Sequence, residues 1–353
     1  MTDPGLRAIQ ADQGATFTDQ QSTPVDFGDA TEEYSVARNA TALFDLNDRT
    51  QIEITGNDRA TFLHSFCTND IKVLEPGQGC EAFITNVKGR VLAHVFVFAD
   101  QNALEIDATA DMEDALISHL DRYIITEDVE LHRKTEQQGD LLLSGPQATA
   151  ALESLGVAAA SLTPLSQTSG TLFETSVVVR RVDLLGSPGL LLSVPRAELV
   201  PVWTGLTETG IRPAGSAALN ALRIEAGTPM YGVDVSEENL APEVGRNSQA
   251  ISFTKGCYLG QEPIARIDSM GHVNRELRGL RLSAGPVPAA GAPVLSADDG
   301  NEEIGRITSA AISYADNLPV ALAYLRRTHL APGTEVLVQT ESAAIPATVT
   351  GNI

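Results

Sequence analysis

Apolar and polar positions alternate in several short stretches of the chain and follow a helical spacing in others. Residues 51–55 alternate with period two and predict a strand. The β-rich residues 82–86 and 91–98 flank a turn and predict a hairpin. Residues 110–124 place apolar side chains at helical spacing. A second group of strands and helices of the same kind follows and ends near residue 226.

After about residue 274 the pattern changes to short β segments separated by Gly and Pro, which predicts a small all-β domain, a barrel. The two earlier groups predict α+β lobes with antiparallel, ferredoxin-like sheets. We therefore expect an α+β fold in which residues 1–274 hold lobes at about 40–135 and 136–274, and residues 275–353 form the barrel. The first 35 residues have few apolar periods and are expected to be a loosely structured lead-in.

The composition is typical of a globular protein that needs no disulfides. Of the 353 residues, 43% are hydrophobic, which is enough for a sizeable core. The longest uncharged stretch, residues 155–173, is interrupted by polar residues, Pro and Gly, so no transmembrane helix is expected. The N-terminus has no basic start followed by an apolar run, and three scattered cysteines make no disulfide framework. We expect a protein of the reducing cytoplasm.

The chain is strongly acidic, with 46 acidic against 24 basic residues and a formal net charge of −22. Such a surface repels phosphates and anionic lipids, so neither nucleic acid nor a membrane is an expected partner. Only four of the basic residues are lysine. Acidic excess with few lysines is typical of a halophilic protein, because concentrated salt screens like charges. The alternative is an acidic protein from ordinary salt.

Candidate chemistry is densest in residues 255–262, which read Lys-Gly-Cys-Tyr-Leu-Gly-Gln-Glu. The glycines let the backbone turn sharply and approach a ligand closely. Lys255 would favour the reactive thiolate form of Cys257. The alternative is a tight turn between a strand and a helix that buries an inert cysteine.

Two acidic residues lie on the loop that follows the predicted helix 216–226. A carboxylate on a loop can accept paired hydrogen bonds from the amino group and ring N–H of a flat heterocycle, which makes Asp234 and Glu243 candidates. Because the chain has 46 acidic residues, each is equally an ordinary solvated acid. The predicted hairpin tip at residues 86–90 is by itself only a turn.

Other standard motifs are absent from the sequence. There is no Gly-x-Gly-x-x-Gly after a strand, no phosphate loop, no His-x-x-x-His pair and no cysteine pair at zinc-ligand spacing, so no metal site is expected. The three cysteines would hold an iron–sulfur cluster only if the fold or a second subunit brought them together.

Taken together, these segments resemble the YgfZ-type folate-binding proteins, which are relatives of the glycine-cleavage T protein, an aminomethyltransferase. The run at residues 255–262 is similar to that group's signature. Further similarity lies in Ile54-Thr55-Gly56-Asn57-Asp58-Arg59, in Lys88-Gly89-Arg90 and in the barrel run Ile304-Gly305-Arg306-Ile307-Thr308-Ser309. The resemblance therefore covers nearly the whole chain.

The resemblance implies a three-domain ring that binds tetrahydrofolate, or a one-carbon derivative, in a central opening between the lobes. It implies that Glu243, in a run similar to the T protein's Pro-x-Glu-Ala-Gly region, holds the pterin. Cys257 and Lys255 are the candidate catalytic residues. The other candidate cofactor-binding residues are Asn86, Asp234, Tyr258, Gln261 and Arg266.

One difference from the T protein distinguishes it from the YgfZ-type proteins as a model for this chain. The T protein carries paired aspartates after its Gly-Gly, one of which serves transfer at the folate nitrogen, whereas this chain has Ala93 and His94 there. The main hypothesis is therefore a tetrahydrofolate-binding accessory factor for assembly or repair of iron–sulfur clusters, with iron–sulfur client or assembly proteins as partners. The alternatives are a folate-dependent aminomethyl- or methyltransferase, in which another group replaces the aspartate, and a folate sensor or storage protein without chemistry.

The halophile hypothesis predicts a stability that depends on salt. Lowering the salt from about 1 M to about 0.1 M lengthens the Debye length from about 3 Å to about 10 Å and lets the carboxylates repel one another. We expect the melting temperature, followed by circular dichroism, to fall by many degrees over this range. A melting temperature that stays constant would favour the ordinary acidic protein.

Overall fold

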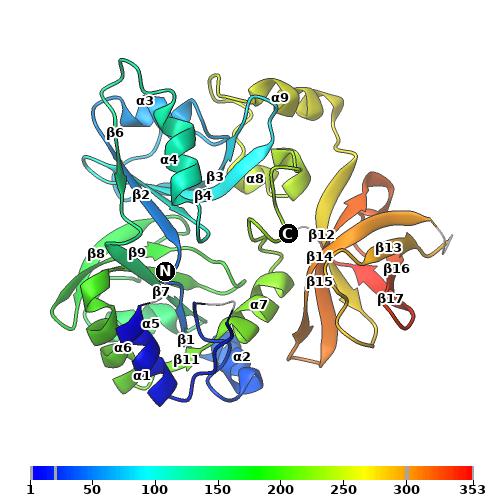
Figure 1. The fold of residues 1–353 in the computed structure, drawn as a ribbon, viewed down its shortest axis with the longest axis horizontal. Helices are drawn as coiled ribbons and strands as arrows, with labels where there is room; N and C mark the ends of the chain where they lie inside the picture. Colours follow the sequence, from blue (N-terminus) through cyan, green and yellow to red (C-terminus); the bar gives the residue numbers. More distant parts are fainter. Residues whose placement is uncertain (1–2, 20–21, 299–301, 352–353) are drawn as a thin grey trace. The chain divides into compact units, whose positions relative to one another are not determined.

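The computed structural model describes residues 3–19, 22–298 and 302–351, and the chain groups into two compact units. Unit 1 comprises Met1–Ala82 and Val95–Leu219, and unit 2 comprises Phe83–His94 and Asn220–Ile353. Figure 1 shows their helices and strands. The expected boundaries of the two lobes stay a prediction.

Unit 1 holds a six-stranded sheet and most of a five-stranded sheet, of which residues 83–85 and 91–94 belong to unit 2. The five-stranded sheet has the order β3 (Gly79–Thr85), β4 (Val91–Ala99), β5 (Leu104–Ala108), β2 (Thr50–Thr55) and β6 (Glu130–Arg133). The six-stranded sheet has the order β11 (Arg212–Ala214), β1 (Ala42–Asp45), β7 (Gln138–Ser144), β10 (Gly189–Pro195), β9 (Thr175–Arg181) and β8 (Gln167–Leu172). Its pairs are antiparallel except for β1 with β11. The helices are α1 (Pro4–Asp12), α2 (Ala30–Asn39), α3 (Arg59–His64), α4 (Glu113–Asp121), α5 (Ala148–Ser154) and α6 (Leu199–Glu208).

The N-terminal segment is not a loose lead-in, and that expectation is wrong. The carboxylate of Asp3 accepts a hydrogen bond of 2.9 Å from the backbone N–H of Leu6, which caps α1, and Pro4 stands at the first helical position. Leu6 is fully buried in the core of unit 1. Each N-terminal helix buries few residues, so the apolar pattern is weak although the capping signals are present in the sequence.

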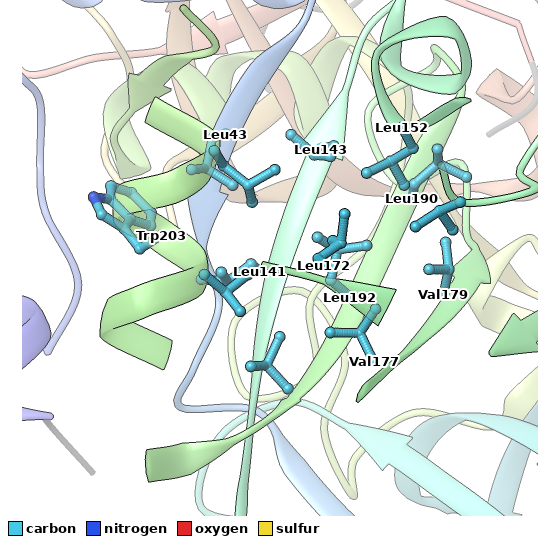
Figure 2. Packing of buried hydrophobic residues seen from close by; sticks show 14 of the residues in the cluster. Leu43, Leu141, Leu143, Leu152, Leu172, Val177, Val179, Leu190, Leu192 and Trp203 are labelled. Carbon is cyan, nitrogen blue, oxygen red and sulfur yellow. The ribbon is translucent and has the colours of Figure 1, made fainter. Parts of the chain in front are cut away.

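One face of the six-stranded sheet forms an apolar core in unit 1. Successive side chains of a strand point to opposite faces, so Leu141 and Leu143 of β7 share this face with Leu190 and Leu192 of β10 (Figure 2). Three helices cover it with Leu6 of α1, Leu152 of α5 and Trp203 of α6.

Unit 2 contains a closed barrel of six strands. Its order is β12 (Arg275–Leu282), β15 (Leu318–Arg326), β14 (Glu303–Ser313), β13 (Pro293–Ser296), β16 (Glu335–Gln339) and β17 (Ala344–Val349). Before it come α7 (Ser216–Glu225), in which the unit boundary falls, α8 (Asn247–Ala250) and α9 (Gln261–Met270). The expected α+β class with antiparallel sheets and a C-terminal barrel is confirmed. In the described part of the chain, no helix combines the length and apolar character needed to cross a membrane.

The other face of the six-stranded sheet carries charged groups that meet the five-stranded sheet within unit 1. Arg180 of β9 is buried and pairs with Glu105 of β5, and Arg49 pairs with Asp107 of β5. Asp140 of β7 is fully buried beside Asp107. Neither oxygen of Asp140 accepts a hydrogen bond from any residue that the structure describes. Two guanidinium groups therefore accompany three carboxyl groups.

A proton on Asp140 would balance the charges of this cluster. Burial, and then repulsion from Asp107, raise the pKa of Asp140 well above its ordinary range, against the attraction of Arg180 and Arg49. A protonated Asp140 donates a hydrogen bond to Asp107 and leaves the cluster neutral. An ionised Asp140 would leave one negative charge without compensation in a buried place, which is costly.

Asp140→Asn should therefore change how stability depends on pH. Because folding raises the pKa of Asp140, the wild type loses stability as the pH rises from the unfolded value of about 3.9 through the folded pKa. Asparagine mimics the neutral acid and has no such loss. We expect the melting temperature of the variant to gain on that of the wild type as the pH rises above about 4.

The matched control is Asp121→Asn, at an exposed position at the end of α4, which should follow the wild type. A constant difference between Asp140→Asn and the wild type over this pH range would contradict a protonated Asp140.

Candidate functional site

Three segments of unit 2 that hold candidate residues share one apolar core. They are the hairpin tip (residues 86–90), the acidic loop after α7 (residues 228–245) and the cysteine turn before α9 (residues 255–260). The core beneath them contains Phe83, Val91, Val235, Val244, Tyr258 and Ile264. Segments far apart in the sequence are thus brought together by burial.

The hairpin tip and the cysteine turn touch backbone to backbone. Gly260 has a φ of +85°, and a Cβ there would lie 2.3 Å from the carbonyl oxygen of Asn86. A Cβ on Gly89 would lie 3.1 Å from the carbonyl oxygen of Gly260. Beside this contact, the Thr85 hydroxyl donates a hydrogen bond of 2.6 Å to the carbonyl oxygen of Leu259. Two glycines are therefore needed where these segments meet.

The side chain of Asn86 organises the hairpin tip. Its Oδ1 accepts hydrogen bonds from the backbone N–H groups of Lys88 at 2.8 Å and Arg90 at 3.2 Å. Arg90 in turn reaches the acidic loop, where its Nη1 donates to the carbonyl oxygen of Glu238. The turn thus uses the side-chain oxygen of Asn86. The predicted role of Asn86 in cofactor binding stays a prediction.

Cys257 is exposed between two buried side chains of the cysteine turn. Lys255 and Tyr258 are buried, and the Lys255 Nζ lies 4.9 Å from the centroid of the Tyr258 ring, a cation–π contact. The exposed thiol contradicts the alternative of a buried, inert cysteine. Its predicted catalytic role and that of Lys255 stay predictions.

Gln261 and Arg266 lie on α9. Gln261 is the first residue of this helix and is partly buried. Arg266 is exposed, and its Nη2 lies 3.4 Å from Glu262 Oε1 in a surface ion pair. A surface pair of this kind contributes little stability, so the guanidinium is accessible to other partners.

Asp234 links the acidic loop to the barrel. Its Oδ2 accepts hydrogen bonds from Arg223 Nη1 at 2.8 Å and the Met230 backbone N–H at 2.9 Å. Its Oδ1 accepts from the hydroxyls of Thr308 at 2.5 Å and Ser309 at 2.6 Å. The carboxylate is 0% exposed. These four bonds occupy both oxygens, which argues against the predicted role of Asp234 in ligand binding.

A β-bulge allows two consecutive hydroxyls to reach one carboxylate. Neighbouring residues of a regular strand point to opposite faces. The register of β14 against β15 shifts between Ile307 and Ser309, so Thr308 and Ser309 both turn toward Asp234.

Glu243 is held more loosely than Asp234. It lies in a short 3-10 helix, Ala241–Val244, where its Oε2 accepts from the Leu240 backbone N–H at 3.1 Å. Arg275 of β12 donates to Oε1 from Nε at 3.2 Å and to Oε2 from Nη2 at 3.3 Å. The Glu243 side chain is 11% exposed and that of Arg275 43%. Charge-assisted bonds are usually about 2.7–2.9 Å, so this pair is long.

Tyr324 of β15 lies beneath this pair. The Arg275 guanidinium lies 5.1 Å from the centroid of its ring. Burial, and then the charge of Glu243, raise the pKa of Tyr324. Its hydroxyl has no hydrogen-bond partner among the described residues. Arg275 and Tyr324 could not be predicted as site residues from the sequence, because only the pairing of β12 with β15 brings them together.

Ala93 and His94 stand where, by the resemblance, the T protein carries its paired aspartates. Both lie on β4, where Ala93 is fully buried and His94 is 8% exposed. The centroids of the His94 and Phe83 rings are 5.0 Å apart. The imidazole is thus held against the apolar core of the three segments.

Comparison with known families places both parts of the chain. Residues 6–255 match the GCVT N-terminal domain, and residues 275–353 match the glycine cleavage T-protein C-terminal barrel domain. The cysteine turn beyond Lys255 and all of α9 fall between these two matches.

Individual relatives match over nearly the whole length. An aminomethyltransferase of Staphylococcus carnosus is 28% identical over 334 residues, which are 92% of this chain and 90% of the relative. One of Streptomyces avermitilis is 28% identical over 340 residues, with 93% and 90% covered. The crystal structure of glycine cleavage system aminomethyltransferase T from Bartonella henselae is similar with a TM-score of 0.89 and 21% identity, and covers 98% of this chain and 96% of that one. This structural similarity shows the fold.

These comparisons correct the main functional hypothesis. The relatives are named aminomethyltransferase, so the expectation of an accessory factor for iron–sulfur clusters is wrong, and the transferase alternative fits better. The expected iron–sulfur partners are not supported. The YgfZ-type assignment is not supported beyond the T-protein family. It depended on residues 255–262, nearly all of which lie outside the matched regions.

The geometry of Asp234 predicts a large effect on stability. Asp234→Ala leaves the guanidinium of Arg223, 5% exposed, without its partner. Breaking a buried pair in this way costs about 3–5 kcal/mol of the free energy of unfolding. We expect this difference between the free energies of unfolding of the wild type and the variant, measured by urea denaturation.

The control is Asp316→Ala, which breaks the partly exposed pair with Arg281 in the same unit and should cost at most about 1 kcal/mol. Equal losses in the two variants would refute the linking role of Asp234.

Proposed function

The chain belongs to the glycine cleavage T-protein family, and from this membership we propose that it is a folate-dependent aminomethyl- or methyltransferase. The observation that carries the proposal is the match of both the N-terminal domain and the barrel domain in one chain, supported by relatives of that name. The proposed cofactor is tetrahydrofolate or a one-carbon derivative.

Glu243 is the proposed group that holds the pterin. It is a carboxylate on a loop, partly accessible, and its oxygens accept three hydrogen bonds from described residues. A carboxylate has about four acceptor positions. Asp234, by contrast, has four donors and no accessible surface. The two acids of the loop therefore differ in what they can offer a ligand.

His94 is the proposed replacement for the missing aspartate. The transfer at the folate nitrogen requires a group that gives or takes a proton, and histidine serves this purpose most often in enzymes. His94 follows the hairpin tip on β4 and is held against Phe83, so its ring has a fixed place. Cys257, the exposed thiol of the cysteine turn, stays a second candidate.

The test is one-carbon transfer to tetrahydrofolate by the purified protein, with a reconstituted glycine cleavage reaction and with methylated amines as donors. Removing a general acid or base typically costs about 10²–10⁴-fold in rate. We expect His94→Ala to lose this factor in kcat while its affinity for tetrahydrofolate stays within about twofold.

His272→Ala, at an exposed position of the same unit, is the matched control and should keep full activity. A wild-type protein that binds tetrahydrofolate but transfers from neither class of donor would contradict the proposal. An active His94→Ala would remove only the role of His94.

A further inference from the structure

The Glu243–Arg275 pair is arranged side-on. Two neighbouring donors of one guanidinium, Nε and Nη2, face the two oxygens of one carboxylate at 3.2 and 3.3 Å. This bidentate arrangement uses both oxygens of the carboxylate, which together recognise planar groups with two parallel N–H donors.

A pterin presents the same pattern of donors as arginine. Its ring N–H and its amino group are attached to one carbon, as Nε–H and Nη2–H are in a guanidinium. Both therefore require the same edge of Glu243, and only one of them can occupy it. The remaining position on Oε1 accepts a single hydrogen bond and cannot replace the pair.

We propose that Arg275 competes with the heterocycle for Glu243 and that ligand binding is an exchange of these two partners. This inference rests on the proposed function, since it takes the pterin of a folate as the ligand. Arg275 then determines specificity. A ligand without both donors would displace Arg275 and leave the Glu243 carboxylate unpaired and mostly buried, which is unfavourable.

The contacts of Arg275 are those of an exchangeable partner. Its bonds to Glu243 are long, and 43% of its side chain is exposed. The Arg223–Asp234 pair of the same unit has a bond of 2.8 Å and exposures of 5% and 0%. One pair is thus sealed within the fold, whereas the other has solvent on one side.

Arg275 has other contacts that remain when it leaves Glu243. Its guanidinium lies over the Tyr324 ring, and Nη2 lies 3.3 Å from the carbonyl oxygen of Glu238. The side chain therefore has a resting place beside the site after the exchange. A cation on the face of an aromatic ring is attracted to it even at a partly exposed position.

The experiment compares dissociation constants for tetrahydrofolate in the wild type and in Arg275→Ala. Removing the competitor should tighten binding about tenfold, because the free protein no longer has to break the pair. Arg281→Ala is the matched control, since it removes one arginine and one partly exposed ion pair from the same strand. It should change the dissociation constant by less than about twofold.

Two further variants make the result specific to Glu243. Glu243→Gln should weaken binding about tenfold or more, and adding Arg275→Ala to it should bring no gain. Arg275→Gln replaces Arg275→Ala if the latter fails to fold by near-ultraviolet circular dichroism, and the same tightening is expected.

Unchanged or weaker binding in the Arg275 variants would overturn the competition, even if the wild type binds tetrahydrofolate and transfers one-carbon groups. Absence of tetrahydrofolate binding in the wild type would overturn both this inference and the proposed function. Tightening by Arg275→Ala that persists in the Glu243→Gln background would also overturn it, because the gain would then not depend on Glu243.

Discussion

The organisation of unit 2 depends on one carboxylate that has lost all contact with water. Asp234 has four donors, from α7, from its own loop and from two hydroxyls of β14. A buried charge is tolerated only when such partners are in place, so the acidic loop and the barrel must take up their positions together. Glu243 lies at the end of that loop and Arg275 on the first barrel strand. The geometry of the candidate site therefore follows from a residue that itself offers nothing to a ligand.

A similar contrast between fixed and available charge holds between a buried cluster of unit 1 and the Glu243–Arg275 pair of unit 2. In unit 1 the charged cluster between the sheets is fully buried at Asp140 and needs a proton there to be neutral. In unit 2 the pair of Glu243 and Arg275 keeps solvent access and long bonds. Sealed clusters of this type specify how elements pack, whereas partly exposed pairs can exchange partners.

Much of the fold could be predicted from local pattern, because apolar residues recur with a different period in strands and in helices. The class and the C-terminal barrel were predicted correctly. The pairing of β1 with β7 could not be predicted, since residues 42–45 and 141–144 are joined only by long-range contacts. In the site, Glu243 was a candidate from the loop it occupies. Its partner Arg275 is the first residue of an ordinary strand, and no local sequence pattern marks it as a site residue. Nor does any local pattern predict the β-bulge that turns Thr308 toward Asp234.

The resemblance misled at the level of function because packing and chemistry use the same residues in the cysteine turn. Gly260 is required by the backbone of the hairpin tip, which approaches within a distance that no Cβ allows. Tyr258 belongs to the apolar core of the three segments, and its ring makes a cation–π contact with Lys255. These packing roles account for several residues of the run 255–262, which is similar to the signature of the YgfZ-type proteins. Among the residues they leave without a packing explanation is Cys257, whose thiol is exposed. Any chemistry peculiar to this turn is best sought in that side chain, whereas the proposed pterin site rests on Glu243 and Arg275.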